Sequence, residues 1–210
     1  MSIHPGDPHA ETRLVRLGPP PAEARLATIL MHGRDQDDTV TGDLAGRLDV
    51  ADVAHVLPVA SARSWYPGRY FDPLASLEPH LGGALAAIDR AIAAAGLPDE
   101  RLVLAGFSQG ACLIAEYLAR QGPRQFHGAA ILTGSLLGTP TERAEPRIAP
   151  GLPMAFASSR HDDWIPIDDA LDTADRFRQA GATVTVAELE DRIHHISDEA
   201  VTQLRALLLA

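Results

Sequence analysis

The chain of 210 residues is poor in the features that build disulfides, thiolate metal sites and membrane spans. Its single cysteine, Cys112, cannot close an internal disulfide and excludes a zinc site made of several thiolates. No uninterrupted apolar run approaches the roughly 18 residues that a membrane-spanning helix needs. Residues 1–21 also lack the apolar centre of a signal peptide. We therefore expect a soluble, cytoplasmic protein without a membrane partner.

Positive charge is also scarce. The chain has 18 arginines and no lysine against 28 acidic residues, which gives a formal net charge of −10. Proteins that bind nucleic acids use basic patches, so this balance excludes nucleic acid as a partner. With 46% hydrophobic residues, the chain can bury one sizeable core and is too short for two ordinary domains. We expect a single domain over residues 1–210, with a partly irregular segment at residues 1–24.

Short apolar runs alternate along the chain with longer stretches of helical periodicity. Most of the apolar runs are continuous, which is typical of strands covered on both faces. The alternation predicts an α/β fold with a mostly parallel sheet and helices on both faces, and a polar surface loop at residues 138–153. The expected strands are residues 26–31, 55–59, 102–107, 129–133, 154–157 and 183–189, with residues 14–17 as a candidate edge strand; the expected helices are residues 77–95, 111–120, 168–180 and 198–209.

A glycine-bounded serine stands between the strand at residues 102–107 and the helix that follows. The sequence Gly106-Phe107-Ser108-Gln109-Gly110 has the form G-x-S-x-G, in which the two glycines permit a tight and strained turn. Such a turn exposes the serine hydroxyl at a helix N-terminus, where the helix dipole favours a developing negative charge. We interpret Ser108 as a nucleophile; the alternative is a glycine-rich turn without chemistry.

A serine needs a base to take its proton and an acid to orient that base. In this type of fold the chain order is serine, acid, histidine. Asp162 and Asp163 follow the strand at residues 154–157, and His194 and His195 follow the strand at residues 183–189. Since neighbours on an extended loop point in different directions, only one residue of each pair can take part.

A negative charge that develops on a carbonyl oxygen has to be stabilised by backbone N–H groups. One donor is expected from Gln109, the residue after the serine. The second is expected from the loop after residues 26–31, where Gly33 permits a turn that presents the N–H of Arg34. We therefore predict that Arg34 and Gln109 form an oxyanion hole.

These pieces resemble the phospholipase/carboxylesterase branch of the α/β-hydrolases, which includes acyl-protein thioesterases and small bacterial carboxylesterases. The resemblance implies a serine hydrolase with no large lid, no metal and no cofactor, which cleaves small to medium carboxylic esters. Thioesters and lysophospholipids are the alternative substrates, and homodimers are common in the family. The matching segments are residues 29–33, 64–66, 106–110, 162–166 and 194, which together span most of the chain.

The family pattern also chooses between the paired candidates. It places the acid four residues before a proline and the histidine two residues before an apolar residue. Counting back from Pro166 and Ile196 assigns Asp162 and His194. The same pattern favours Trp65 and Tyr66 as substrate-pocket residues; the alternative is that their loop forms a small satellite core.

The chain departs from the family pattern at two places. Asp35 stands where the oxyanion loop usually has a second glycine, which makes the conformation around Arg34 an open question. Ser158 and Ser159 stand where a glycine usually precedes the acid.

Two further functions stay open at this point. One is a metal site made from the acidic and histidine residues at 161–163 and 194–195, and the other is a non-catalytic scaffold that binds a small ligand.

We expect Cys112 to be a core residue. The remaining histidines have no partner visible in the sequence and are expected at the surface or as capping groups: His4, His9, His55, His80 and His127.

Overall fold

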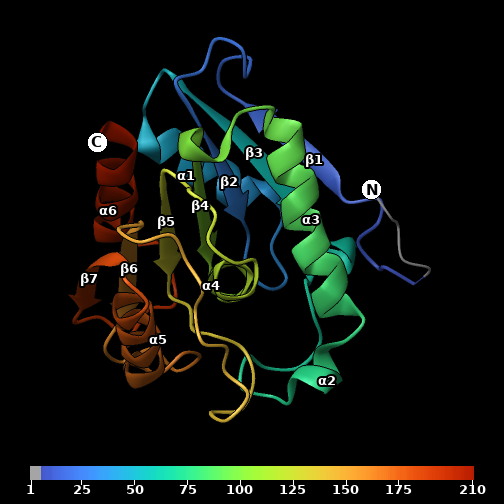
Figure 1. Cartoon of the computed structure of the whole chain (residues 1–210), viewed down its shortest axis with the longest axis vertical. Helices are drawn as coiled ribbons and strands as arrows, with labels where there is room; N and C mark the ends of the chain where they lie inside the picture. The colour runs from blue at the N-terminus through green and yellow to red at the C-terminus, as the bar shows by residue number, and fades with distance from the viewer. Residues whose placement is uncertain (1–5) are drawn as a thin grey trace.

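The continuous apolar runs form the inner strands of a seven-stranded sheet in the computed structural model, which describes residues 6–210. The strand order is β1-β3-β2-β4-β5-β6-β7, and every neighbouring pair is parallel except β1 with β3. The predicted mostly parallel sheet is therefore confirmed (Figure 1). The strands are β1 (Arg13–Leu17), β2 (Leu26–Met31), β3 (Val53–Val59), β4 (Leu102–Phe107), β5 (Gly128–Leu132), β6 (Pro153–Ser159) and β7 (Thr183–Leu189).

Helices cover both faces of this sheet (Figure 1). Successive residues of a strand point to opposite faces, so Ile29 and Met31 of β2 belong to one apolar cluster and Leu30 to the other. Helices α3, α4 and α5 pack on the first face, and α1 and α6 pack on the second. The helices are α1 (Asp38–Leu48), α2 (Leu74–Leu77), α3 (His80–Ala95), α4 (Gln109–Arg120), α5 (Ile167–Gln179) and α6 (Asp198–Leu209).

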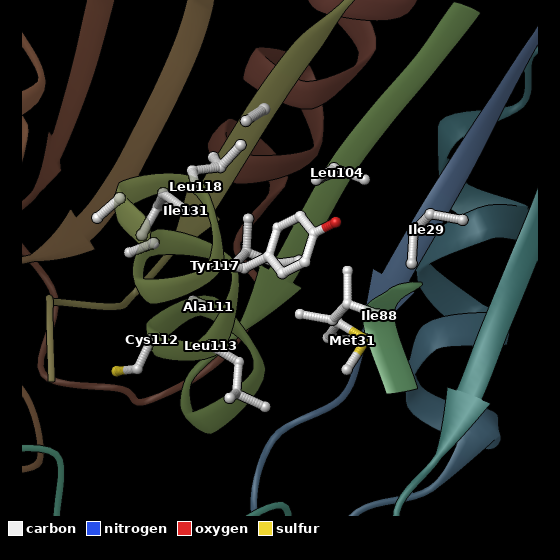
Figure 2. Close-up of a cluster of buried hydrophobic side chains, with 14 of the residues drawn as sticks. Ile29, Met31, Ile88, Leu104, Ala111, Cys112, Leu113, Tyr117, Leu118 and Ile131 are labelled. Carbon is white, nitrogen blue, oxygen red and sulfur yellow. The ribbon is translucent and has the colours of Figure 1, made fainter. Parts of the chain in front are cut away.

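Helix α4 is buried almost all round, which explains its nearly uniform apolar sequence. Figure 2 shows Leu113 and Tyr117 of this helix in one cluster with Met31 and Leu104 of the sheet. Each large apolar side chain removed from water in this way contributes roughly 1.5–3 kcal/mol to stability. Cys112 is a core residue of the same helix, and burial raises the pKa of its thiol to about 11. The packing fixes α4, and with it the turn that precedes it.

The structure differs from the sequence-based prediction at α1, at α2 and at residues 138–153. Helix α1 was not expected, because its sequence is polar and carries two glycines; the Asp37 side chain caps it by accepting from the N–H of Thr39. The expected helix at residues 77–95 is divided in two before Pro79. The loop at residues 138–153 is not wholly a surface loop, since it buries Ile148 and Leu152.

The described N-terminal residues hold one strand, β1, between turns, and residues 1–5 of the expected irregular segment lie outside the described part. His4 lies there too. His9 and His55 were expected at the surface or as capping groups. Both are buried, which corrects the surface placement, and His9 accepts from the backbone N–H of Ser61. No helix within residues 6–210 combines the length and the apolar character that crossing a membrane requires.

Candidate active site

Ser108 lies at a sharp turn between β4 and α4, with φ 53° and ψ −119°. This is a strained backbone conformation for a residue other than glycine, and such strain clusters at functional sites. A Cβ atom at Gly106 would collide with the backbone of Gly110, and a Cβ atom at Gly110 would collide with the carbonyl of Met31. Both glycines are therefore required by close backbone approach, as the G-x-S-x-G pattern predicts.

The structure brings together one residue from each of the three predicted positions. Nε2 of His194 lies 2.7 Å from Oγ of Ser108, and Nδ1 of His194 lies 2.7 Å from Oδ2 of Asp162. Asp163 is exposed, and Nδ1 of His195 lies 2.9 Å from the carbonyl oxygen of Ile193. The assignment of Asp162 and His194 over their neighbours thus agrees with the geometry.

The Asp162 carboxylate is buried, and both of its oxygens have hydrogen-bond partners. Its Oδ1 accepts hydrogen bonds from the backbone N–H of Trp164 (2.8 Å) and of Ile165 (2.9 Å). Burial by itself raises the pKa of Asp162, but the hydrogen bonds from His194, Ile165 and Trp164 outweigh it, so the pKa lies below its ordinary value. An ionised Asp162 accepts from Nδ1–H of His194, which leaves Nε2 free to accept the proton of the Ser108 hydroxyl.

Arg34 and Gln109, whose backbone N–H groups are predicted to form the oxyanion hole, both line the cavity that contains Ser108. Neither N–H donates a hydrogen bond within residues 6–210. The loop that carries Arg34 is held on both sides: Gly33 N–H donates to Oε1 of Gln36 (2.9 Å), and Asp35 N–H donates to the carbonyl of Arg63 (2.8 Å). The arrangement leaves two donors available to a substrate oxygen.

Asp35 adopts φ 59°, in the left-handed region that glycine favours. Aspartate tolerates this region better than most residues. Asp35 therefore holds a left-handed backbone conformation at the position where the family pattern has glycine.

The Gln109 side chain has a role that sequence reasoning missed. Its Oε1 accepts from the backbone N–H of Trp65 (2.9 Å), and its Nε2 donates to the carbonyl of Tyr66 (2.8 Å). The residue after the nucleophile thus holds the loop that forms another wall of the cavity. In the sequence, the available signal was an amide side chain directly after the serine. Its hydrogen-bond partners could not be identified, because they lie more than forty residues away in the sequence.

Trp65 and Tyr66 were both predicted as pocket residues, and only Tyr66 lines the cavity. Trp65 is fully buried beneath the loop, where its indole N–H donates to the carbonyl of His32 (2.9 Å). The prediction for Trp65 is therefore wrong: it is part of the core that supports the oxyanion loop. Its aromatic ring packs between those of His9 and His32, with centroids 5.4 and 4.9 Å away.

Two buried histidines fix the segment between β3 and Tyr66. Nδ1 of His9 accepts from Ser61 N–H (3.2 Å), and its Nε2 lies 2.9 Å from the carbonyl oxygen of Trp65. Nε2 of His32 accepts from Ala60 N–H (3.0 Å). Burial lowers the pKa of both imidazoles, so both are neutral and each can accept at one ring nitrogen.

The cavity in front of Ser108 has a volume of about 230 Å³. Aromatic and aliphatic side chains form much of its wall. One of them, Trp164, was not identified from the sequence. Its side chain is 60% exposed, and its ring centroid lies 6.1 Å from that of His194. Polar groups include Ser108, His194 and two arginines. The apolar lining residues are Tyr66, Tyr70, Phe107, Cys112, Trp164 and Ile165.

The alternative of a metal site has no geometric support in the described chain. Within residues 6–210, no three His, Cys, Asp or Glu side chains lie together as ligands for a metal ion. Asp162 and His194, two members of the candidate cluster, are instead hydrogen-bonded to each other and to Ser108.

Comparison with known proteins gives a consistent result. The sequence profile of a family described as Phospholipase/Carboxylesterase matches residues 19–209. Among solved structures, a phospholipase/carboxylesterase from Dyadobacter fermentans is 27% identical with a TM-score of 0.86, and covers 95% of this chain and 97% of its own. A search of curated proteins finds no match.

More distant structures share the fold. Esterase PE8 is 20% identical with a TM-score of 0.78, and covers 95% of this chain and 99% of its own. A carboxylesterase from Mesorhizobium loti is 18% identical with a TM-score of 0.72, and covers 95% and 94% of the two chains. Together with the family match, these similarities confirm the fold class predicted from the sequence, and no large lid covers the site in the described part of the chain.

Proposed function

The chain belongs to the phospholipase/carboxylesterase family of α/β-hydrolases, and from this we propose that it is a serine hydrolase that cleaves small to medium carboxylic esters through an acyl-enzyme. Family membership supports ester hydrolysis in general. The observation that carries the finer proposal is the continuous hydrogen-bonded series from Ser108 through His194 to Asp162, at the cavity.

In the first half of the reaction, Oγ of Ser108 attacks the ester carbonyl while Nε2 of His194 takes the hydroxyl proton. Asp162 stabilises the imidazolium that forms, because its carboxylate is held ionised against Nδ1. The backbone N–H groups of Arg34 and Gln109 donate to the carbonyl oxygen as it becomes negative. The C–O bond to the alcohol then breaks, and the alcohol leaves with the proton from His194.

In the second half, a water molecule loses a proton to Nε2 of His194 and attacks the acyl carbon. The bond to Oγ of Ser108 breaks, and Ser108 recovers its proton from the imidazolium. The overall reaction is ester plus water to carboxylic acid plus alcohol. No metal or cofactor takes part in any of these steps.

The substrate size follows from the cavity. A volume of about 230 Å³ lies below the roughly 300–1,000 Å³ of sites that enclose drug-sized ligands, so it suits short or medium acyl groups. The aromatic walls provide apolar surface for such groups.

Labelling with a fluorophosphonate probe tests the proposal, because the probe phosphonylates an activated serine. We expect one label per chain, located at Ser108 by peptide mass spectrometry, and no label in Ser108→Ala. The exposed Ser76, whose hydroxyl donates to the carbonyl of Pro73, provides a matched control, and Ser76→Ala should be labelled like the wild type. A wild-type chain that stays unlabelled would favour the non-catalytic scaffold.

A series of p-nitrophenyl esters from acetate to palmitate then tests the substrate size. We expect the highest kcat/KM at acyl groups of about two to eight carbons, in keeping with the cavity. A maximum at long acyl chains would contradict the size limit without contradicting the serine mechanism.

A further inference from the structure

Within residues 6–210, two arginines on the wall of the cavity have no carboxylate partner. Most arginines of the described chain lie within 4 Å of an aspartate or glutamate, as expected in a protein with 28 acidic residues. Arg34 and Arg69 form no such pair, and both line the cavity that contains Ser108. The cavity wall therefore carries positive charge that the protein itself does not neutralise.

Neutral groups hold these two guanidinium groups in place. Arg34 donates to the carbonyl of Gly68 and to Oγ of Ser64 (3.3 Å), and its guanidinium carbon lies 5.9 Å from the centroid of the Tyr66 ring. The guanidinium carbon of Arg69 lies 5.8 Å from the centroid of the Phe71 ring. Since a guanidinium has five N–H donors, Arg34 keeps donors available after these contacts.

The other charged groups nearby do not cancel this charge. Asp35 also lines the cavity, but its side chain is exposed and forms no ion pair with either arginine. Asp72 accepts from the backbone N–H of Arg69 (2.7 Å) and forms no ion pair with its guanidinium. The wall thus has two guanidinium groups against one lining carboxylate, in a chain whose net charge is −10.

The strand order shows on which side of Ser108 the arginines lie. Ser108 follows β4, at the middle of the sheet; Arg34 follows β2 and Arg69 follows β3, on one side of it. His194 follows β7 and Trp164 follows β6, on the other side (Figure 1). Because the departing alcohol takes its proton from His194, the alcohol lies on the β6–β7 side. The acyl group therefore extends toward Arg34 and Arg69.

We propose that the acyl group of the preferred substrate ends in a carboxylate, so that the protein hydrolyses monoesters of dicarboxylic acids. This inference rests on the proposed serine esterase function and specifies its substrate class. Arg34 and Arg69 bind the free carboxylate while Ser108 attacks the ester carbonyl at the other end of the acyl chain. The alcohol leaves, and water then releases the dicarboxylic acid from Ser108. The two arginines bind and do not exchange protons or electrons.

The test compares two esters of equal length, monoethyl glutarate and ethyl pentanoate, by the rate of ethanol release. Hydrogen bonds between a guanidinium and a carboxylate are stronger than those between neutral groups, so we expect kcat/KM to be about tenfold or more higher for monoethyl glutarate. Arg69→Gln should lower this ratio at least about threefold. Arg205→Gln, which removes an exposed arginine on α6, is the matched control and should leave the ratio unchanged. Added salt should lower the ratio by screening the charges.

Each other outcome counts against a specific part of the inference. A ratio of one or less, with ethyl pentanoate hydrolysed by the wild type and not by Ser108→Ala, would overturn the carboxylate preference and leave the esterase function intact. A preference for 3-carboxypropyl butanoate over butyl butanoate, without one for monoethyl glutarate, would place the carboxylate on the alcohol and overturn the acyl assignment. Absence of hydrolysis of every ester would contradict the esterase function and this inference together.

Discussion

The backbone N–H of Trp65 donates a buried hydrogen bond of 2.9 Å to the side chain of Gln109, the residue directly after the serine. The amide nitrogen of the same glutamine donates to Tyr66. In the proposed mechanism, Gln109 therefore offers its backbone N–H to the substrate oxygen, while its side chain holds another wall of the cavity. The two parts of the residue can be separated by mutation.

We expect Gln109→Ala to lower kcat about tenfold and the free energy of unfolding by about 2–3 kcal/mol, because the N–H of Trp65 and the carbonyl of Tyr66 lose their buried partners. Gln109→Glu buries a carboxylate and sets one of its oxygens against the carbonyl of Tyr66, so its loss of stability should be at least as large as that of Gln109→Ala. Urea denaturation and steady-state kinetics provide the two measurements. Wild-type stability in Gln109→Ala would show that the loop does not depend on this side chain.

The paired candidates for acid and base can be compared directly. We expect Asp162→Asn and His194→Ala each to lower kcat by about 10³-fold or more, since the first leaves the wrong tautomer and the second removes the base. Asp163→Asn and His195→Ala are the matched controls and should stay within about tenfold. All four proteins are compared by circular dichroism before the kinetics. Full activity in His194→Ala with loss in His195→Ala would refute the assignment.

His55 makes stability depend on pH. It is buried beside Thr28, with Nδ1 2.8 Å from Oγ1, and burial lowers its pKa to about 4 from the ordinary value of 6.5. Between these two values the unfolded chain binds the proton and the folded chain does not, so stability falls as the pH falls from 6.5 to 4. This histidine accounts for roughly 3 kcal/mol of the loss.

The measurement is the free energy of unfolding at several pH values for the wild type and His55→Gln. Glutamine can still form a hydrogen bond with Thr28 but does not titrate. We expect the two curves to converge as the pH falls to 4. Parallel curves over this range would show that His55 is not responsible.

Stability and kcat should depend on the shape of the residue that replaces Asp35. Glycine adopts the left-handed conformation at no steric cost, so Asp35→Gly should keep the stability of the wild type to within about 1 kcal/mol. Asp35→Val should cost about 1–3 kcal/mol and lower kcat, because a β-branched residue resists φ 59° and the shift moves the N–H of Arg34. Asp43→Val, at an exposed position in α1, is the control. Equal effects of both valines would exclude backbone conformation as the cause.

The candidate Ser108 could be identified from the sequence because the glycines beside it are required by a turn whose residues are consecutive. Asp162 and His194 follow strands in the expected order, but the family pattern was needed to separate each from its neighbour. The inner strands were predictable as well, since burial on both faces makes them continuously apolar.

The parts that could not be predicted depend on contacts between distant segments. Trp65 was assigned to the pocket from the family pattern, and nothing in its neighbourhood reveals that its indole reaches the carbonyl of His32. His9 and His55 were expected at the surface or as capping groups, because the sequence shows no partner for either. Their partners, the carbonyl of Trp65 and the hydroxyl of Thr28, lie 56 and 27 residues away. Helix α1 lacks a strong apolar face, and its position is fixed by packing on the sheet and against α6.

The space around each glycine also indicates which positions can accept substitutions. Gly106 and Gly110 cannot accept even one methyl group, so a library of random variants should retain glycine at both positions. Gly46 in α1 has a helical conformation and open space where a Cβ atom would be. Alanine there should stabilise the protein by about 0.5–1 kcal/mol. Long-term divergence of this sequence is therefore expected to be slow at the serine turn and fast along α1.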